Sequence, residues 1–93
     1  MTPAEATRLA GQLRALADPT RLRLLELIHA TPGITVIELR KQLGGPLTQP
    51  TISSHLGWLK RAGMVRFEKT GVWHRFTIEP DGRAAIEAMK VLR

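Results

Sequence analysis

Strong helix-start signals, each followed by a glycine or proline stop, divide the first two-thirds of the chain into short helices. Each start places a threonine or aspartate just ahead of a proline, or three residues ahead of a glutamate. Such residues satisfy the free backbone N–H groups of a first helical turn. The four starts are Thr2, Asp18, Thr35 and Thr48. We therefore expect helices over residues 2–17, 18–30, 35–43 and 48–63.

The hydrophobic period changes from helical to strand-like after Gly63. Residues 64–68 and 72–78 are expected to be strands, and Lys69-Thr70-Gly71 between them suits a hairpin turn. Asp81 is the expected cap of a last helix. The chain is thus predicted to be one domain over residues 1–93, mainly α with a β-hairpin, in the order α-α-α-α-β-β-α. That order is the winged helix-turn-helix arrangement.

The helix over residues 48–63 has the pattern of a recognition helix. Ile52, Leu56 and Leu59 form one narrow apolar stripe that should face the core. The opposite side and the N-terminal turns carry short polar groups, which can reach base edges in the DNA major groove. Basic residues on the hairpin suit the neighbouring phosphates. The residues expected to contact double-stranded DNA are Thr48, Gln49, Thr51, Ser53, Ser54, His55, Arg61, Lys69, His74 and Arg75.

The distribution of charge supports a polyanionic partner. The chain has 14 basic and 8 acidic residues, a formal net charge of +6. Seven of the basic residues, and Glu68 as the only acid, lie between Arg40 and Arg75. The rest of the chain is neutral, with seven residues of each sign. Clustering of this kind is typical of a nucleic-acid-binding surface.

Several other classes of protein are disfavoured. The chain has no cysteine, which excludes disulfides, thiolate metal sites and cysteine nucleophiles. No acid/base pair, activated nucleophile or glycine-rich phosphate loop is present, so neither an enzyme nor a cofactor is expected. No apolar run is long enough to cross a membrane, and the cytoplasm is the expected location. A winged-helix protein-interaction module is the alternative from another class.

Two long segments resemble the ArsR/SmtB family of repressors. Residues 15–25 are similar to the family's signature at the junction of its first two helices. Residues 48–56, followed by 59–65, are similar to its recognition helix and its entry to the wing. The resemblance implies a repressor that binds a palindromic operator as a homodimer, joined through its first and last helices. Apolar residues at both ends of this chain suit that role. They are Leu9, Leu13, Leu16, Ile86, Met89 and Leu92.

Metal sensing is well known in the resembled family, but its ligand patterns are not met here. The helix over residues 35–43 has no cysteine, and the last helix offers Asp81 and Glu87 without a histidine. His29, His55 and His74 are far apart in sequence and lack ligand spacing. No metal site is expected within one chain. A zinc- or nickel-responsive regulator, with a non-standard histidine/carboxylate site across the dimer, is a further alternative. The effector is not specified by any motif.

Overall fold

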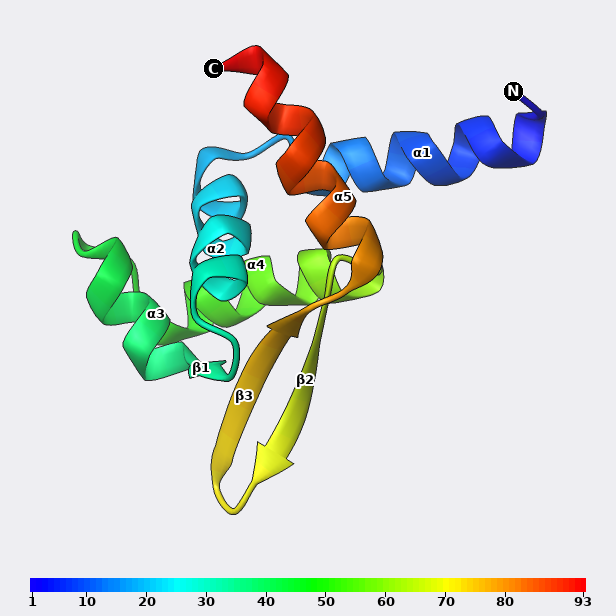
Figure 1. The fold of residues 1–93 in the computed structure, drawn as a ribbon. Helices are drawn as coiled ribbons and strands as arrows, with labels where there is room; N and C mark the ends of the chain where they lie inside the picture. Colours follow the sequence, from blue (N-terminus) through cyan, green and yellow to red (C-terminus); the bar gives the residue numbers. More distant parts are fainter.

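A computed structural model describes residues 1–93 and has the predicted order of helices and hairpin (Figure 1). One short strand is added to the prediction, between the second and third helices. The elements are α1 (Pro3–Leu16), α2 (Pro19–Ala30), β1 (Ile34–Thr35), α3 (Val36–Leu43), α4 (Gln49–Arg61), β2 (Val65–Thr70), β3 (Trp73–Ile78), α5 (Pro80–Met89) and a 3-10 helix (Lys90–Leu92).

The predicted starts of the first four helices are confirmed by capping hydrogen bonds. At the start of α1, the Glu5 N–H donates to Thr2 Oγ1 at 3.1 Å, and the Thr2 N–H donates to the Glu5 carboxylate at 2.9 Å. Thr35 and Glu38 form the same reciprocal pair at the start of α3. The Thr2 N–H is the main cause of the lowered pKa of Glu5. The pKa of Glu38 is lowered mainly by the Thr35 hydroxyl, which donates to its carboxylate at 2.8 Å, and then by the Thr35 N–H.

The predictions for the hairpin turn and for the cap of α5 were wrong. Thr70 pairs with Trp73, so the turn is Gly71-Val72, and Lys69 and Thr70 belong to β2. Gly71 takes a φ of +62°, which suits a two-residue hairpin turn. Glu79 occupies the cap position of α5 without a side-chain bond. The Asp81 carboxylate lies inside the first turn and binds residues of α1 instead.

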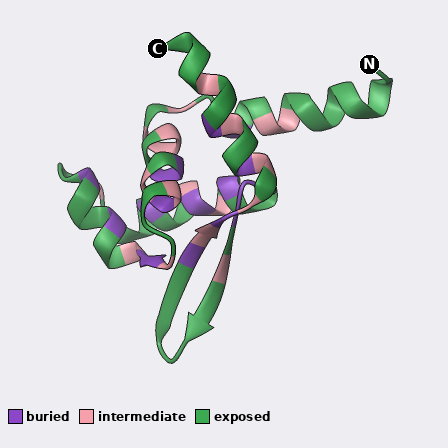
Figure 2. Cartoon of the chain, viewed as in Figure 1, coloured by how far each residue is buried: buried purple, intermediate pink, exposed green.

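The core lies where α2 and α4 meet the sheet. The sheet is antiparallel in the order β1-β3-β2, with Phe67 opposite Phe76. The predicted stripe is confirmed, because Ile52, Leu56 and Leu59 are all buried. Figure 2 shows buried residues gathered on α2, α4 and the base of the sheet, whereas the hairpin tip is exposed. Helix α4 is therefore packed against the core on one side and exposed on the other.

Helix α5 is anchored to the base of the hairpin by close backbone packing. The Glu79 N–H donates to the Met64 carbonyl oxygen at 2.9 Å. A Cβ atom on Gly82 would lie only 2.2 Å from the same oxygen, so only glycine fits there. This contact fixes the angle at which α5 leaves the sheet.

Helix α1 projects from the body of the molecule (Figure 1), and Ala15 is its only buried residue. Leu9 and Leu13 are 40% and 56% exposed. They line a groove of about 340 Å³ between α1 and α5, together with Met89 and Leu92. Ile86, also predicted to lie at the dimer interface, is 6% exposed and belongs to the core of its own chain. None of the helices is both long and apolar enough to cross a membrane.

Candidate nucleic-acid interface

The first two turns of α4 present short polar side chains to solvent. Thr48 caps the helix: its hydroxyl accepts from the Thr51 N–H at 3.4 Å and lies 3.0 Å from the Thr51 hydroxyl. Gln49, Ser53 and Ser54 are exposed, and their side chains make no hydrogen bond within the chain. These three residues therefore have free donors and acceptors on the exposed side of the helix, while Thr48 stabilises the helix itself.

A hollow lies between α4 and the face of the hairpin that is nearest to α4. Ser53 and Lys60 line it from the helix, and Phe67 and His74 line it from the hairpin, around a volume of about 240 Å³. The imidazole of His74 stacks on Phe67 with ring centroids 4.6 Å apart. The Lys60 ammonium lies 4.3 Å from the centre of the Phe67 ring. We call this hollow the helix–wing cleft; it brings Ser53 and His74 together although they come from different elements.

The basic side chains of the hairpin differ in whether they have an ion-pair or hydrogen-bond partner within the chain. Arg66 pairs with Glu79 at 2.7 Å, and this carboxylate raises the pKa of Arg66 above its ordinary value. Arg75 donates to the Gly33 carbonyl oxygen at 3.2 Å. Lys69 is exposed and makes neither an ion pair nor a hydrogen bond with its side chain. Lys69 is thus the hairpin cation most available to an external phosphate.

His55, another predicted DNA contact, is directed toward neighbouring helices rather than to the exposed side of α4. It is half-buried, and its Nδ1 lies 3.3 Å from an Arg21 guanidinium nitrogen and 3.9 Å from the Asp18 carboxylate. Asp18 caps α2, accepting from the Arg21 N–H at 3.0 Å. This backbone bond is the main cause of the lowered pKa of Asp18, and His55 and the Arg21 charge act in the same direction. His55 thus belongs to the contact between α4 and the α1–α2 junction.

Arg21 is the centre of that contact. Its Nε donates to the Ala15 carbonyl oxygen at 2.6 Å, at the end of α1. Its guanidinium carbon lies 4.8 Å from the centre of the Trp58 ring on α4. Arg61, one of the predicted DNA contacts, lies 5.6 Å from the same ring and makes no ion pair.

The sequence analysis missed two residues beside these groups. Lys60 lines the helix–wing cleft, and Trp73 lines an adjoining hollow of about 390 Å³ with Gln49 and Ser53. Trp73 is 45% exposed. An aromatic residue two positions after the hairpin glycine was a signal that could have found it. In the described chain no three histidine, aspartate or glutamate side chains come close enough to hold a metal ion.

Comparison with known proteins identifies the family. Residues 16–66 match the model of a family described as a helix-turn-helix domain. The chain is 41% identical over 74 residues to an uncharacterised HTH-type transcriptional regulator, MJ1325, of Methanocaldococcus jannaschii, covering 80% of this chain and 81% of the relative. The crystal structure of an ArsR family transcriptional regulator, RHA00566, superposes with a TM-score of 0.74 at 32% identity, covering 92% of this chain and 86% of that one. The chain belongs to the ArsR family of transcriptional regulators.

The arsenic resistance transcriptional regulator ArsR1 of Pseudomonas putida is another relative within the ArsR family, 36% identical over 76 residues. The match covers 82% of this chain but only 58% of ArsR1. The relatives are transcriptional regulators, which confirms the function class expected from the sequence. A winged helix-turn-helix DNA-binding domain from Mycobacterium bovis superposes with a TM-score of 0.84 at 24% identity, covering 96% of this chain and 81% of that one, which confirms the expected fold. For this ArsR-family chain, the exposed side of α4 and the hairpin are the candidate DNA-binding elements.

Proposed function

We propose that this ArsR-family regulator is a homodimeric repressor that binds a palindromic operator. Two copies related by a twofold axis would place two α4 helices in successive major grooves, which matches the symmetry of a palindrome. Its partners are then double-stranded DNA and a second copy of the chain, and it would act in the cytoplasm.

The proposal for DNA binding rests mainly on the unpaired polar groups of α4. Gln49, Ser53 and Ser54 are exposed and have no partner within the chain. Gln49 and Ser53 also line the hollows between α4 and the hairpin. Short polar groups suit base edges, whereas flexible cations such as Lys69 neutralise phosphates without selecting a sequence. Further DNA contacts would come from Thr51 on α4 and from His74 and Arg75 on the hairpin.

The proposal for a dimer rests on the groove between α1 and α5. Nine of the eleven residues that line it are hydrophobic, and Leu9, Leu13 and Leu92 are well exposed. Exposing such a surface is costly for a chain of 93 residues. A second copy would cover Leu9, Leu13, Leu16, Met89 and Leu92, while Ile86 stabilises each protomer from within.

Selection of duplexes from a random library, followed by footprinting, tests the proposal. We expect a palindromic consensus and protection of two half-sites about one helical turn apart. Sedimentation at micromolar concentration should give twice the chain mass of 10.3 kDa. A monomer that still bound one sequence tightly would refute the dimer. Failure to enrich any sequence, with no salt-dependent binding to bulk DNA, would favour the protein-interaction module.

A further inference from the structure

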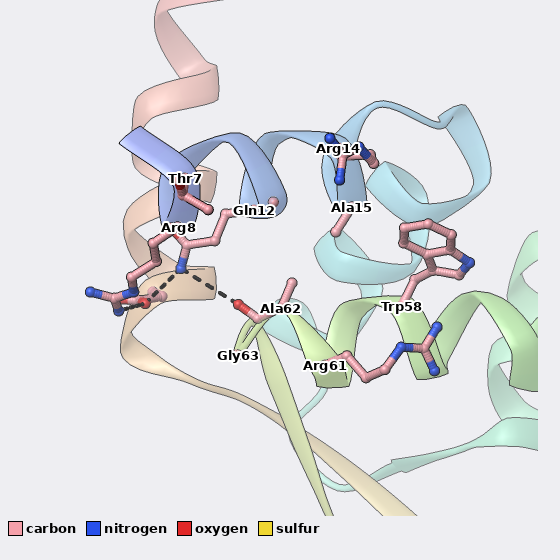
Figure 3. A pocket seen from close by; sticks show the side chains of 11 residues that line it. Thr7, Arg8, Gln12, Arg14, Ala15, Trp58, Arg61, Ala62 and Gly63 are labelled. Carbon is pink, nitrogen blue, oxygen red and sulfur yellow. Dashed lines mark hydrogen bonds and ion pairs between the residues drawn. The ribbon is translucent and has the colours of Figure 1, made fainter. Parts of the chain in front are cut away.

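A second hollow lies between α1 and the C-terminal end of α4, away from the helix–wing cleft. Its volume is about 530 Å³, within the range of pockets that hold small molecules. Small residues, Gly11, Ala15 and Ala62, leave the space open, and Arg14, Trp58 and Arg61 stand around it. Figure 3 shows Arg14 on α1 and Arg61 on α4, with Trp58 beside them.

The charges around this pocket are not balanced within the chain. At one end Arg8 pairs with Asp81 at 2.8 Å, and the Gln12 amide donates to the same carboxylate at 2.8 Å. Arg14 and Arg61 have no ion pair, and neither guanidinium donates a hydrogen bond to any group of the chain. Two uncompensated guanidinium groups therefore border one hollow. Such groups bind carboxylates and phosphates through paired, charge-assisted hydrogen bonds.

The pocket lies on a different side of α1 from the groove assigned to the proposed dimer. Successive residues of a helix turn by about 100°, so Gly11 and Ala15 lie on the side of α1 opposite Leu9 and Leu13. The leucines line the groove to α5, whereas Gly11 and Ala15 line the pocket beside α4. Gln12 and Asp81 line both hollows, but the two open on different sides of α1, so a second copy seated on the leucines need not fill the pocket beside α4.

We propose that this pocket binds a small organic anion between Arg14 on α1 and Arg61 on α4, with a flat apolar part lying along Gly11 and Ala15, next to Trp58. Arg61 is also among the proposed DNA contacts. An anion that binds Arg61 removes that cation from the DNA surface and favours release of the operator. This consequence rests on the proposed function, whereas anion binding itself does not.

Anion binding can be measured without DNA through the fluorescence of Trp58. The chain has only two tryptophans, so a Trp73→Phe variant reports on Trp58 alone. We expect 4-nitrobenzoate or 4-nitrophenyl phosphate to quench it saturably, and the uncharged 4-nitrobenzamide to give no saturable quenching. In the same background, Arg14→Ala should lower the affinity for the anion at least tenfold. Arg83→Ala, which removes the same charge from an exposed position on α5, should leave that affinity unchanged.

Operator titrations separate a small-molecule site from a site for a DNA phosphate. Without an anion, Arg14→Ala should bind the operator as tightly as the unaltered protein. Adding the bound anion should weaken operator binding at least threefold in the unaltered protein but not in Arg14→Ala. Two results would overturn the proposal: no saturable quenching by either anion, or weaker operator binding with a lower salt dependence in anion-free Arg14→Ala. If no operator exists, the quenching result still decides anion binding.

Discussion

Replacing Lys69 by alanine tests how the hairpin contributes to DNA binding. Lys69 lies in β2, one position before the end of the strand, and its ammonium group has no partner within the chain. Its removal therefore breaks no internal contact, and the fold should be unchanged. We expect weaker binding to operator and to random duplex by a similar factor, because a lysine–phosphate contact carries no sequence information.

The expected magnitude follows from counterion release. Each phosphate that a protein neutralises contributes about 0.9 to the slope of log affinity against log salt concentration. One Lys69 contact in each subunit of a dimer thus contributes about two units of slope. Over a fourfold rise in salt concentration, the variant should lose about tenfold less affinity than the unaltered protein.

Fluorescence anisotropy of a labelled duplex, measured over a salt series, gives this slope directly. Arg83→Ala is the matched control, since it removes one exposed and unpaired positive charge from α5 rather than from the hairpin. Its slope should match that of the unaltered protein. If both variants lowered the slope equally, the effect would come from net charge alone and the assignment of Lys69 to a phosphate contact would be refuted.

Four further changes test other parts of the structure. Ser54→Ala should cost about 1–3 kcal/mol on the operator and little on random duplex; equal losses in parallel titrations would contradict a role in base readout. Leu13→Glu should give a monomer in sedimentation, because it places a charge in the groove between α1 and α5; a persistent dimer would place the interface elsewhere. Gly82→Ala should lower the free energy of unfolding in urea by at least about 2 kcal/mol, since its Cβ would meet the Met64 carbonyl oxygen; an unchanged midpoint would contradict that packing. The pKa of Asp18 is lowered from 3.8 in the folded state, so its stabilisation is complete above that pH and lost as pH falls through the folded pKa. Asp18→Asn keeps a capping group and should make the free energy of unfolding less sensitive to acid below about pH 4. An unchanged pH dependence of that free energy would show that the Asp18 carboxylate does not contribute to acid unfolding.

The order of elements could be predicted because its signals are local. Thr2, Asp18, Thr35 and Thr48 cap the helices that they were expected to cap, through bonds to residues three positions on. The errors occurred where local signals compete. Asp81 is a good capping residue, but α5 begins one residue earlier, at Pro80, and the carboxylate binds Arg8 and Gln12. Strand β1 is two residues long and exists only through pairing with β3.

The candidate DNA contacts could be predicted only in part. The helical period places Ser54 on the exposed side of α4 and Ile52 in the core, because side-chain direction within one helix is set by the backbone. His55 lies at the border between these sides, where the helical period does not predict whether a side chain faces the core or the solvent. Its contact with Arg21, 34 residues away in sequence, turns it toward the α1–α2 junction.

The sequence by itself therefore determined the helices, the hairpin, the recognition helix and the excess of positive charge, since each depends on neighbouring residues or on composition. The tertiary structure decided which of those positive charges lack a partner within the chain. Arg66 is neutralised by Glu79 and Arg75 is held by the Gly33 carbonyl, whereas Lys69 and Arg61 have no ion-pair partner. The physical reason is that ion pairing acts over a few ångströms in space, and only the packing of α1, α4 and the sheet brings residues distant in sequence within that range.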